Sequence, residues 1–188
     1  MENNSKNAVL IANYVLSKTG PIDAVKLQKT LYFIEAIHLA RFGTSLIDED
    51  FEAWVHGPVL KSVYKEFKDQ STFLHSQINK TGDTEGCKDL KNEQLALIHE
   101  IIADCVSKSS SNLRLNSHDL VWEQTRKGLG PNDNSNRKMD KKQIRAHYRK
   151  EIAKSENKDL KKVSEDLQES IKNRILKRFN KTWIELAK

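Results

Sequence analysis

The sequence predicts an all-α fold, a single compact domain of six or seven helices with one short irregular or strand-like link and a long basic C-terminal helix. Apolar residues recur every three or four positions through most segments, which is the period of an α-helix. Breaks rich in Gly, Pro, Ser and Asn separate these segments. A chain of 188 residues is also long enough to bury one core.

The first two helices are predicted near the N-terminus. The apolar block at 8–18 fits a short helix, and Gly20-Pro21 ends it because proline cannot continue the helical hydrogen bonds. Asp23 is a suitable N-cap for a second helix over 24–42. Apolar residues cover much of the circumference of this second helix, so we expect it to be the central and most buried element.

An irregular link is predicted next. Residues 44–57 are too short and too acidic for another long helix, and 51–55 have strand-like composition. Pro58 suits the first turn of a helix, and Gly57 permits a sharp entry. We therefore expect a helix over 58–69.

The rest of the chain continues the helical pattern. Apolar spacing defines each helix, and polar or turn-forming residues define each break. The predicted elements are a surface loop at 71–91, a helix at 92–108 capped by Asn92, a break at 109–111, a short helix at 118–127 capped by Ser117, a loop at 129–139, a helix at 141–153 begun by Asp140 and Gln143, and a basic amphipathic helix at about 160–183.

Charge is distributed unevenly along the chain. Residues 1–110 hold 12 Lys and Arg against 15 Asp and Glu, whereas residues 111–188 hold 20 against 11. A basic half suggests an acidic partner or nucleic acid. Tyr148, Phe179 and Trp183 could stack on bases there, but acidic residues interrupt the segment and no helix-turn-helix pattern is present. A nucleic-acid-binding regulatory protein is therefore the alternative function, and a protein interface is favoured.

Several other classes are disfavoured. No run of about 18 apolar residues predicts a membrane helix, and no signal peptide is recognised, so we expect a cytoplasmic protein. Cys87 and Cys105 lie far apart without metal-ligand spacing, so no metal is expected. No nucleophile accompanies His38, His56 or His118, and no Gly-rich phosphate loop exists. We expect no enzyme activity, no catalytic residue and no cofactor.

The order of four motifs resembles a known family. An apolar ANYVL segment, KLQKTLYF with HLARFG, then FEAWVHGPVLKSVYKEF, and finally SHDLVW resemble the Panacea domain, also called the SocA-like antitoxin domain and found in phage proteins. The resemblance covers residues 8–150. It implies an all-helical antitoxin that neutralises a protein toxin encoded beside it, in some members by delivering the toxin to a protease. His56 stands where the family commonly has Tyr or a similar aromatic residue.

The motifs supply candidate partner-binding residues. Lys26 and Lys29 lie in the first turns of the predicted central helix, where cations oppose the helix dipole. They either pair with the acids at 48–50 or extend into solvent, or Lys26 and Gln28 hydrogen-bond the link and hold a groove open for a partner. Trp54 is either a core residue packed on the central helix or a partner-facing anchor. The motif residues are Lys26, Gln28, Lys29, Tyr32, Trp54, His56, Gly57, Pro58 and Trp122.

The terminal helix is the other candidate surface. We expect 1–150 to form the helical antitoxin domain and 151–188 a basic helix that belongs to the domain or to the partner interface. An apolar stripe on that helix must be covered by the domain or by a partner. We expect a toxin to bind the stripe together with the KLQK turn and loop 71–91, and the oligomeric state stays open. The stripe residues are Leu160, Val163, Leu167, Ile171, Ile175 and Phe179.

Overall fold

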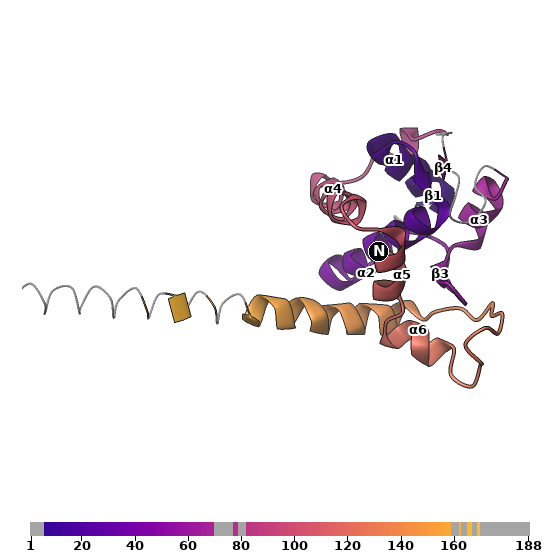
Figure 1. Cartoon of the computed structure of the whole chain (residues 1–188). Helices are drawn as coiled ribbons and strands as arrows, with labels where there is room; N and C mark the ends of the chain where they lie inside the picture. Colours follow the sequence, from indigo (N-terminus) through magenta and orange to yellow (C-terminus); the bar gives the residue numbers. More distant parts are fainter. Residues whose placement is uncertain are drawn as a thin grey trace, which may run out of the picture. The chain divides into compact units, whose positions relative to one another are not determined.

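The computed structural model describes residues 6–69, 77–78 and 82–158, and the single positions 162, 165, 166 and 169. The chain divides into two compact units, 1–149 and 150–188. Within the described residues helices predominate, and the strands form two short two-stranded sheets (Figure 1). This confirms the all-α fold class with strand-like links.

The first two helices form where the sequence places them. Helix α1 spans Ala8–Thr19, and the Asn7 side chain caps it by accepting a hydrogen bond from the Val9 amide. Helix α2 spans Ala24–Phe42, and the Asp23 side chain accepts from the Lys26 amide at 2.8 Å. A short polar side chain at each N-cap satisfies an amide that has no partner within the helix. Both predicted helices are confirmed.

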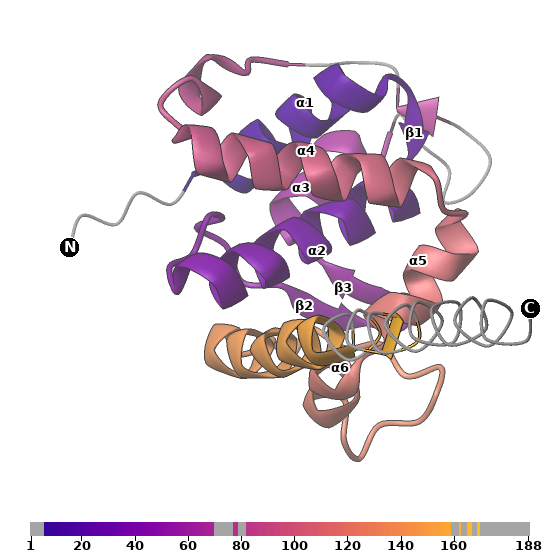
Figure 2. The same ribbon diagram turned by 90° about the vertical axis from the view of Figure 1, so that its left-hand side faces the viewer.

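Helix α2 is the central element of the first unit. It contacts α1, α3 (Lys61–Phe67), α4 (Asn92–Val106) and α5 (Ser110–Ser117). Figure 2 shows α2 between α4 and the hairpin formed by strands β2 (Glu52–Trp54) and β3 (Gly57–Val59). The prediction of a central, buried helix is confirmed, because apolar side chains on several faces of α2 are almost fully buried, among them Leu27, Leu31, Ile34 and Ala36.

The predicted link folds into a β-hairpin. Strand β2 (Glu52–Trp54) pairs antiparallel with strand β3 (Gly57–Val59), as the strand-like composition indicated. The prediction that Gly57 and Pro58 begin a helix is wrong, since α3 begins only at Lys61. Gly57 has φ +97°, a conformation that a tight turn requires and that glycine adopts without strain. Pro58 lacks an amide proton and is tolerated in an edge strand of this kind.

The segment predicted as a surface loop at 71–91 contains regular structure where it is described. Strand β4 (Gln77–Ile78) pairs with strand β1 (Ile22–Asp23), and a short 3₁₀ helix, η1, spans Glu85–Cys87. Ile78 and Cys87 are almost fully buried. These two apolar side chains attach the segment to the core, so the expectation of a purely surface loop is wrong for these residues.

Two helix boundaries differ from the prediction. Helix α4 is capped by Lys91, whose amide donates to the Gln94 side chain at 3.0 Å, one position before Asn92. Helix α5 occupies the predicted break at 109–111. The Ser109 side chain accepts from the Asn112 amide, so this serine run starts a helix instead of ending one.

The late helix is also capped differently. Ser117 ends α5, and Asp119 caps helix α6 (Leu120–Thr125) by accepting from the amides of Val121 and Trp122 at 3.0 Å. A carboxylate near the positive end of the helix dipole is a strong N-cap. The sequence contained this signal in Asp119, and the prediction assigned the cap to Ser117 instead.

The last described segments are helical. Residues 141–149 form a helix in the first unit, and the Asp140 side chain accepts from the Lys142 amide at 2.7 Å, as a cap should. In the second unit residues 150–158 are helical. Most of the predicted helix at 160–183 lies outside the described residues. Across the described part of the chain, no helix combines the length and apolar character that a membrane span requires.

Candidate functional site

A groove lies between α2, the β2–β3 hairpin and α3. Its volume is about 370 Å³. Most of its lining is aliphatic or aromatic, and three basic side chains, Lys29, His56 and Lys68, interrupt the apolar surface. The lining residues that carry the argument below are Gln28, Lys29, Trp54, His56, Val63 and Phe67.

Gln28 joins the central helix to the end of the hairpin. Its side-chain amide donates to the Leu60 carbonyl at 3.2 Å, and its side-chain oxygen accepts from the Leu60 amide at 2.9 Å. Gln28 therefore satisfies both backbone groups of Leu60 as a neighbouring strand would. The interpretation that Gln28 hydrogen-bonds the link is supported by this geometry, and the bonds fix one wall of the groove.

Lys29 is the most unusual side chain in the groove. It is 1% exposed, and its ammonium donates to the Pro58 carbonyl at 2.9 Å. Burial, followed by the nearby charge of Arg114, lowers the pKa of Lys29 to about 7. A Cβ atom at Gly57 would lie 2.8 Å from the ammonium nitrogen, so only glycine leaves room for Lys29 here. The expected pairing of Lys29 with the acids at 48–50 is not observed.

Lys26 does not contact the hairpin. Its ammonium donates to the Val106 carbonyl of α4 at 3.4 Å. Of the alternatives for Lys26, neither the pairing with the acids at 48–50 nor the bond to the link is found among the described residues. A helix places residues three apart on neighbouring positions of its surface, but Lys26 and Lys29 extend to different neighbours.

Further cations and imidazoles surround the Lys29 ammonium. Arg114 of α5 lies 3.4 Å from the His56 ring nitrogen, and its Nε has no hydrogen-bond partner in the described part of the protein. Burial, together with the charges of Lys29 and Arg114, lowers the pKa of His118 to about 4. Burial also lowers the pKa of His56, with Arg114 and Lys29 contributing. We call Lys29, His56, Arg114 and His118 the cationic cluster.

Trp54 stands at the edge of the groove and is only half-buried. Its ring packs edge-on against Tyr64, with centroids 4.9 Å apart, and its indole N–H donates to the Glu52 carboxylate at 2.7 Å. Both interpretations of Trp54, a residue packed on the central helix and a partner-facing anchor, stay open, because its side chain is neither fully buried nor exposed. Trp54 lines the groove together with Gln28 and Lys29 of α2.

Trp122 ties α6 to the same hairpin. Its indole N–H donates to the Trp54 carbonyl at 2.9 Å, and its ring stacks on His118 with centroids 3.9 Å apart. Arg126, which the sequence did not single out, is buried and donates to the Ala53 carbonyl at 2.9 Å. The hairpin is therefore held from α2 on one side and from α6 on the other.

Tyr32 connects α2 to the start of α6. Its hydroxyl donates to the Asp119 carboxylate at 2.6 Å, and the Tyr148 hydroxyl donates to the same oxygen at 3.0 Å. Burial raises the pKa of Tyr32 well above its ordinary value, and the charges and hydrogen bonds of Tyr148 and Asp119 add to the shift. Tyr32 is completely buried, so its role is to position α6.

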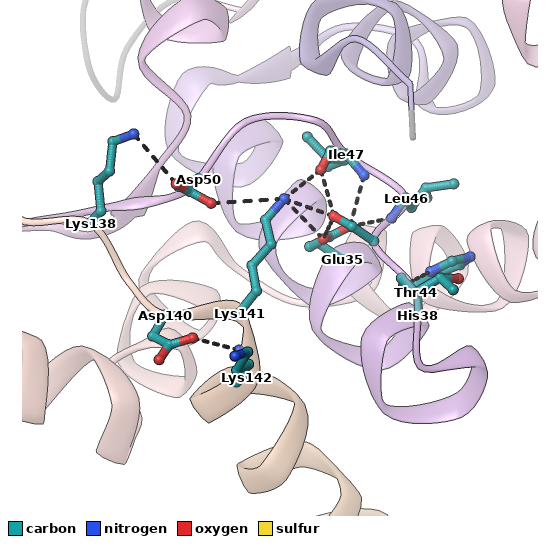
Figure 3. Close-up of polar contacts among 11 residues, drawn as sticks. Glu35, His38, Thr44, Leu46, Ile47, Asp50, Lys138, Asp140, Lys141 and Lys142 are labelled. Carbon is teal, nitrogen blue, oxygen red and sulfur yellow. Dashed lines mark hydrogen bonds and ion pairs between the residues drawn. The ribbon is translucent and has the colours of Figure 1, made fainter. Parts of the chain in front are cut away.

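A second polar cluster lies along α2 from this site. Glu35 is fully buried and accepts from the Leu46 and Ile47 amides at 2.9 Å each. Lys141 reaches the Glu35 carboxylate at 3.5 Å and also donates to Ser45 (Figure 3). This arrangement fixes the loop after α2. The sequence signal for it was Glu35, the single acidic residue of α2, and the prediction did not use it.

The remaining predicted residues give no further chemistry. Leu160, Val163, Leu167, Ile171, Ile175 and Phe179 lie outside the described residues. No group of three His, Cys, Asp or Glu side chains within the described ranges has the proximity to hold a metal ion. What the described site offers is a shape and a charge pattern: an apolar groove beside buried cations.

Comparison with known proteins agrees with this geometry. A family model for the "Antitoxin SocA-like, Panacea domain" matches residues 27–123, which is just over half of the chain and includes the groove and the cationic cluster. Antitoxin SocA of Caulobacter vibrioides (strain NA1000 / CB15N) is 40% identical over 67 residues, a match that spans 34% of this chain and 36% of that protein. No solved structure gives a significant match. The chain belongs to the SocA-like antitoxin family and carries its Panacea domain.

Proposed function

We propose that this protein is the antitoxin of a toxin–antitoxin system and neutralises a co-encoded protein toxin by binding it directly. The observation that carries the proposal is the family match over residues 27–123, since this segment builds the groove from α2, the hairpin and α3. A shaped, mostly apolar groove with a few polar groups is typical of a binding site.

The geometry of the hairpin supports a role in binding. Lys29, Trp122 and Arg126 each donate one hydrogen bond to a carbonyl of the hairpin, and Gln28 bonds the backbone of Leu60 directly after it. A hairpin held in this way presents the rings of Trp54 and Tyr64 in a defined position, and aromatic anchors of this kind dominate binding energies at protein interfaces. Delivery of the bound toxin to a protease is a further step that such a complex would permit.

The experiment for this proposal is co-expression with the product of the adjacent reading frame. Expression of that product alone should arrest growth, and co-expression of this chain should restore it. The two purified proteins should form a complex on size exclusion. Growth arrest that persists at full expression of a folded antitoxin, with no complex, would refute the proposed function.

The terminal stripe is tested in the same assay. A full-length variant with Leu167, Ile171 and Ile175 changed to Ser should lose rescue if a toxin covers the stripe, because apolar burial drives most protein association. The matched control changes the exposed polar residues Lys162, Glu165 and Asp166 of the same segment to Ser. Complete rescue by the stripe variant would show that the toxin does not need the stripe, and the KLQK and hairpin surface would then be the candidate partner site.

A further inference from the structure

The Lys29 ammonium lacks an acidic partner. Within the described residues no Asp or Glu forms an ion pair with it, and its recorded acceptor is the Pro58 carbonyl. An ammonium group carries three N–H donors, and an unpaired charge in a protein interior is costly. Burial lowers the pKa of Lys29 to about 7, which reflects that cost. A buried lysine at the wall of a groove therefore has capacity to bind an anionic group.

Neighbouring elements place further basic side chains around Lys29, of which Arg114 carries a permanent positive charge. Arg114 comes from α5, His56 from the hairpin turn and His118 from the segment between α5 and α6. Arg114 forms no ion pair in the described part of the chain, and its Nε is buried without an acceptor. Among the described residues no carboxylate contributes to the pKa shifts of Lys29 or His118. The cationic cluster is thus electrostatically complementary to an acid.

Beside the cationic cluster the groove is apolar. Val59, Val63 and Phe67 provide its aliphatic and aromatic wall, and Trp54 and Tyr64 its edge. A phosphate group alone would have no use for this surface, whereas a peptide that carries an apolar side chain next to an acidic one matches both parts. Apolar burial would supply affinity, and the charge pair would supply specificity.

We propose that the groove binds a segment of a partner protein that inserts an apolar side chain against Val63 and Phe67 and places an Asp or Glu carboxylate against Lys29. The partner is the toxin of the proposed function, and in this respect the inference rests on that function. The carboxylate comes from a side chain within the segment. A carboxylate that accepts from a buried ammonium forms a charge-assisted hydrogen bond, the strong kind.

The test uses the full chain and a pair of isosteric probes. N-acetyl-Phe-Glu-amide carries a ring and one side-chain carboxylate, and N-acetyl-Phe-Gln-amide replaces only the charge. Binding is followed by two-dimensional NMR on the ¹⁵N-labelled protein, through the amide signals of Val59 and Val63. We expect saturable shifts with the Glu probe and affinity for the Gln probe lower by about tenfold, since a hydrogen bond to a charged group contributes on the order of 1.5–3 kcal/mol.

Three variants locate the charge. Lys29→Met keeps the length of the buried side chain and should reduce affinity for the Glu probe to that for the Gln probe. Lys26→Met, in the same helical turn but bonded to Val106, is the matched control and should bind as the wild type does. Ala24→Phe fills the groove from the first residue of α2 and should abolish binding of both probes. It tests the site if Lys29→Met fails to fold.

The outcomes separate the inference from the function on which it rests. Equal affinity for the two probes, no saturable shift at 10 mM (about the limit for such weak ligands), or stronger binding of N-acetyl-Phe with its free terminus would overturn the inference. So would displacement of the Glu probe by a single-stranded oligonucleotide at physiological salt. Rescue from the toxin by Lys29→Met and Ala24→Phe as complete as by the wild type would overturn the inference and leave the antitoxin function standing. Failure of the wild type to rescue would refute the function.

Discussion

The buried ion pair between Glu35 and Lys141 should contribute measurably to folding. The two charged groups lie 3.5 Å apart, with side chains 0% and 20% exposed respectively. At an effective dielectric constant of about 20 their gross attraction is about 5 kcal/mol, and desolvation of both groups offsets much of it. Lys141 also donates to Ser45 at 2.7 Å and to the Ile47 carbonyl at 2.5 Å, bonds that do not require Glu35.

A double-mutant cycle measures the pair. Lys141→Met in the wild type should lower the free energy of unfolding by about 3 kcal/mol, because it leaves a buried carboxylate without a counter-charge. In the Glu35→Gln background the same change should cost only about 1 kcal/mol, since the bonds to Ser45 and Ile47 and the 4.0 Å contact with the exposed Asp50 are then the interactions lost. Urea unfolding followed by circular dichroism gives both values.

The control is the neighbouring exposed pair. Lys138 lies 3.4 Å from Asp50, with side chains 71% and 41% exposed, so Lys138→Met should cost less than about 1 kcal/mol. If Lys141→Met costs the same in the Glu35→Gln background as in the wild type, the two charges are not coupled and the reasoning fails. The same conclusion follows if Lys141→Met is no more destabilising than Lys138→Met.

Three further predictions concern the groove and the basic segments. The pKa of Lys29 is about 7 in the folded protein and 10.5 when unperturbed, so the unfolded chain binds more protons between these values and stability should rise with pH across this window. In urea unfolding, Lys29→Met should abolish the rise in the free energy of unfolding between pH 7 and 9.5, whereas Lys26→Met should keep it. A rise that persists in Lys29→Met would contradict the assignment. Trp54→Ala should cost about 1–3 kcal/mol, below the 3–5 kcal/mol of a fully buried aromatic residue, because Trp54 is half-buried; a larger loss in thermal melts would show that it is a core residue. Gel shifts should detect no sub-micromolar binding to random duplex or single-stranded DNA at physiological salt, and tight binding that weakens steeply with salt would favour the nucleic-acid alternative.

The hairpin shows where local sequence signals were insufficient. Gly57 and Pro58 are equally compatible with a helix start and with a tight turn into an edge strand. Contacts with α2 favour the hairpin, because Gln28 bonds the Leu60 backbone and Lys29 donates to the Pro58 carbonyl. The conformation of Gly57 and Pro58 thus depends on residues about thirty positions away. The periodicity of the local sequence cannot predict such long-range bonds.

The same limit applies to the cationic cluster. Lys29, His56 and Arg114 are far apart in sequence. Helix α5, which carries Arg114, was not predicted, because residues 109–111 were interpreted as a break. The C-terminal basic segment is recognisable in the sequence because its charged residues lie close together along the chain. A cluster of charged residues from three different elements has no such pattern in the sequence. The motif residues Gln28, Lys29, Trp54 and Trp122 do meet around one hairpin, through contacts that their order in the chain did not reveal.

By itself the sequence determined the helical class, the extents of α1 and α2, the central place of α2 and the family, because apolar periodicity, helix caps and motif order are local properties of the chain. Only the tertiary structure decided that the Gly-Pro pair lies in a hairpin, that Trp54 faces a groove, and that Lys29 is buried without an acidic partner among the described residues. These features depend on which distant residue forms a hydrogen bond with each buried polar group. Those partners are brought together only when the helices pack.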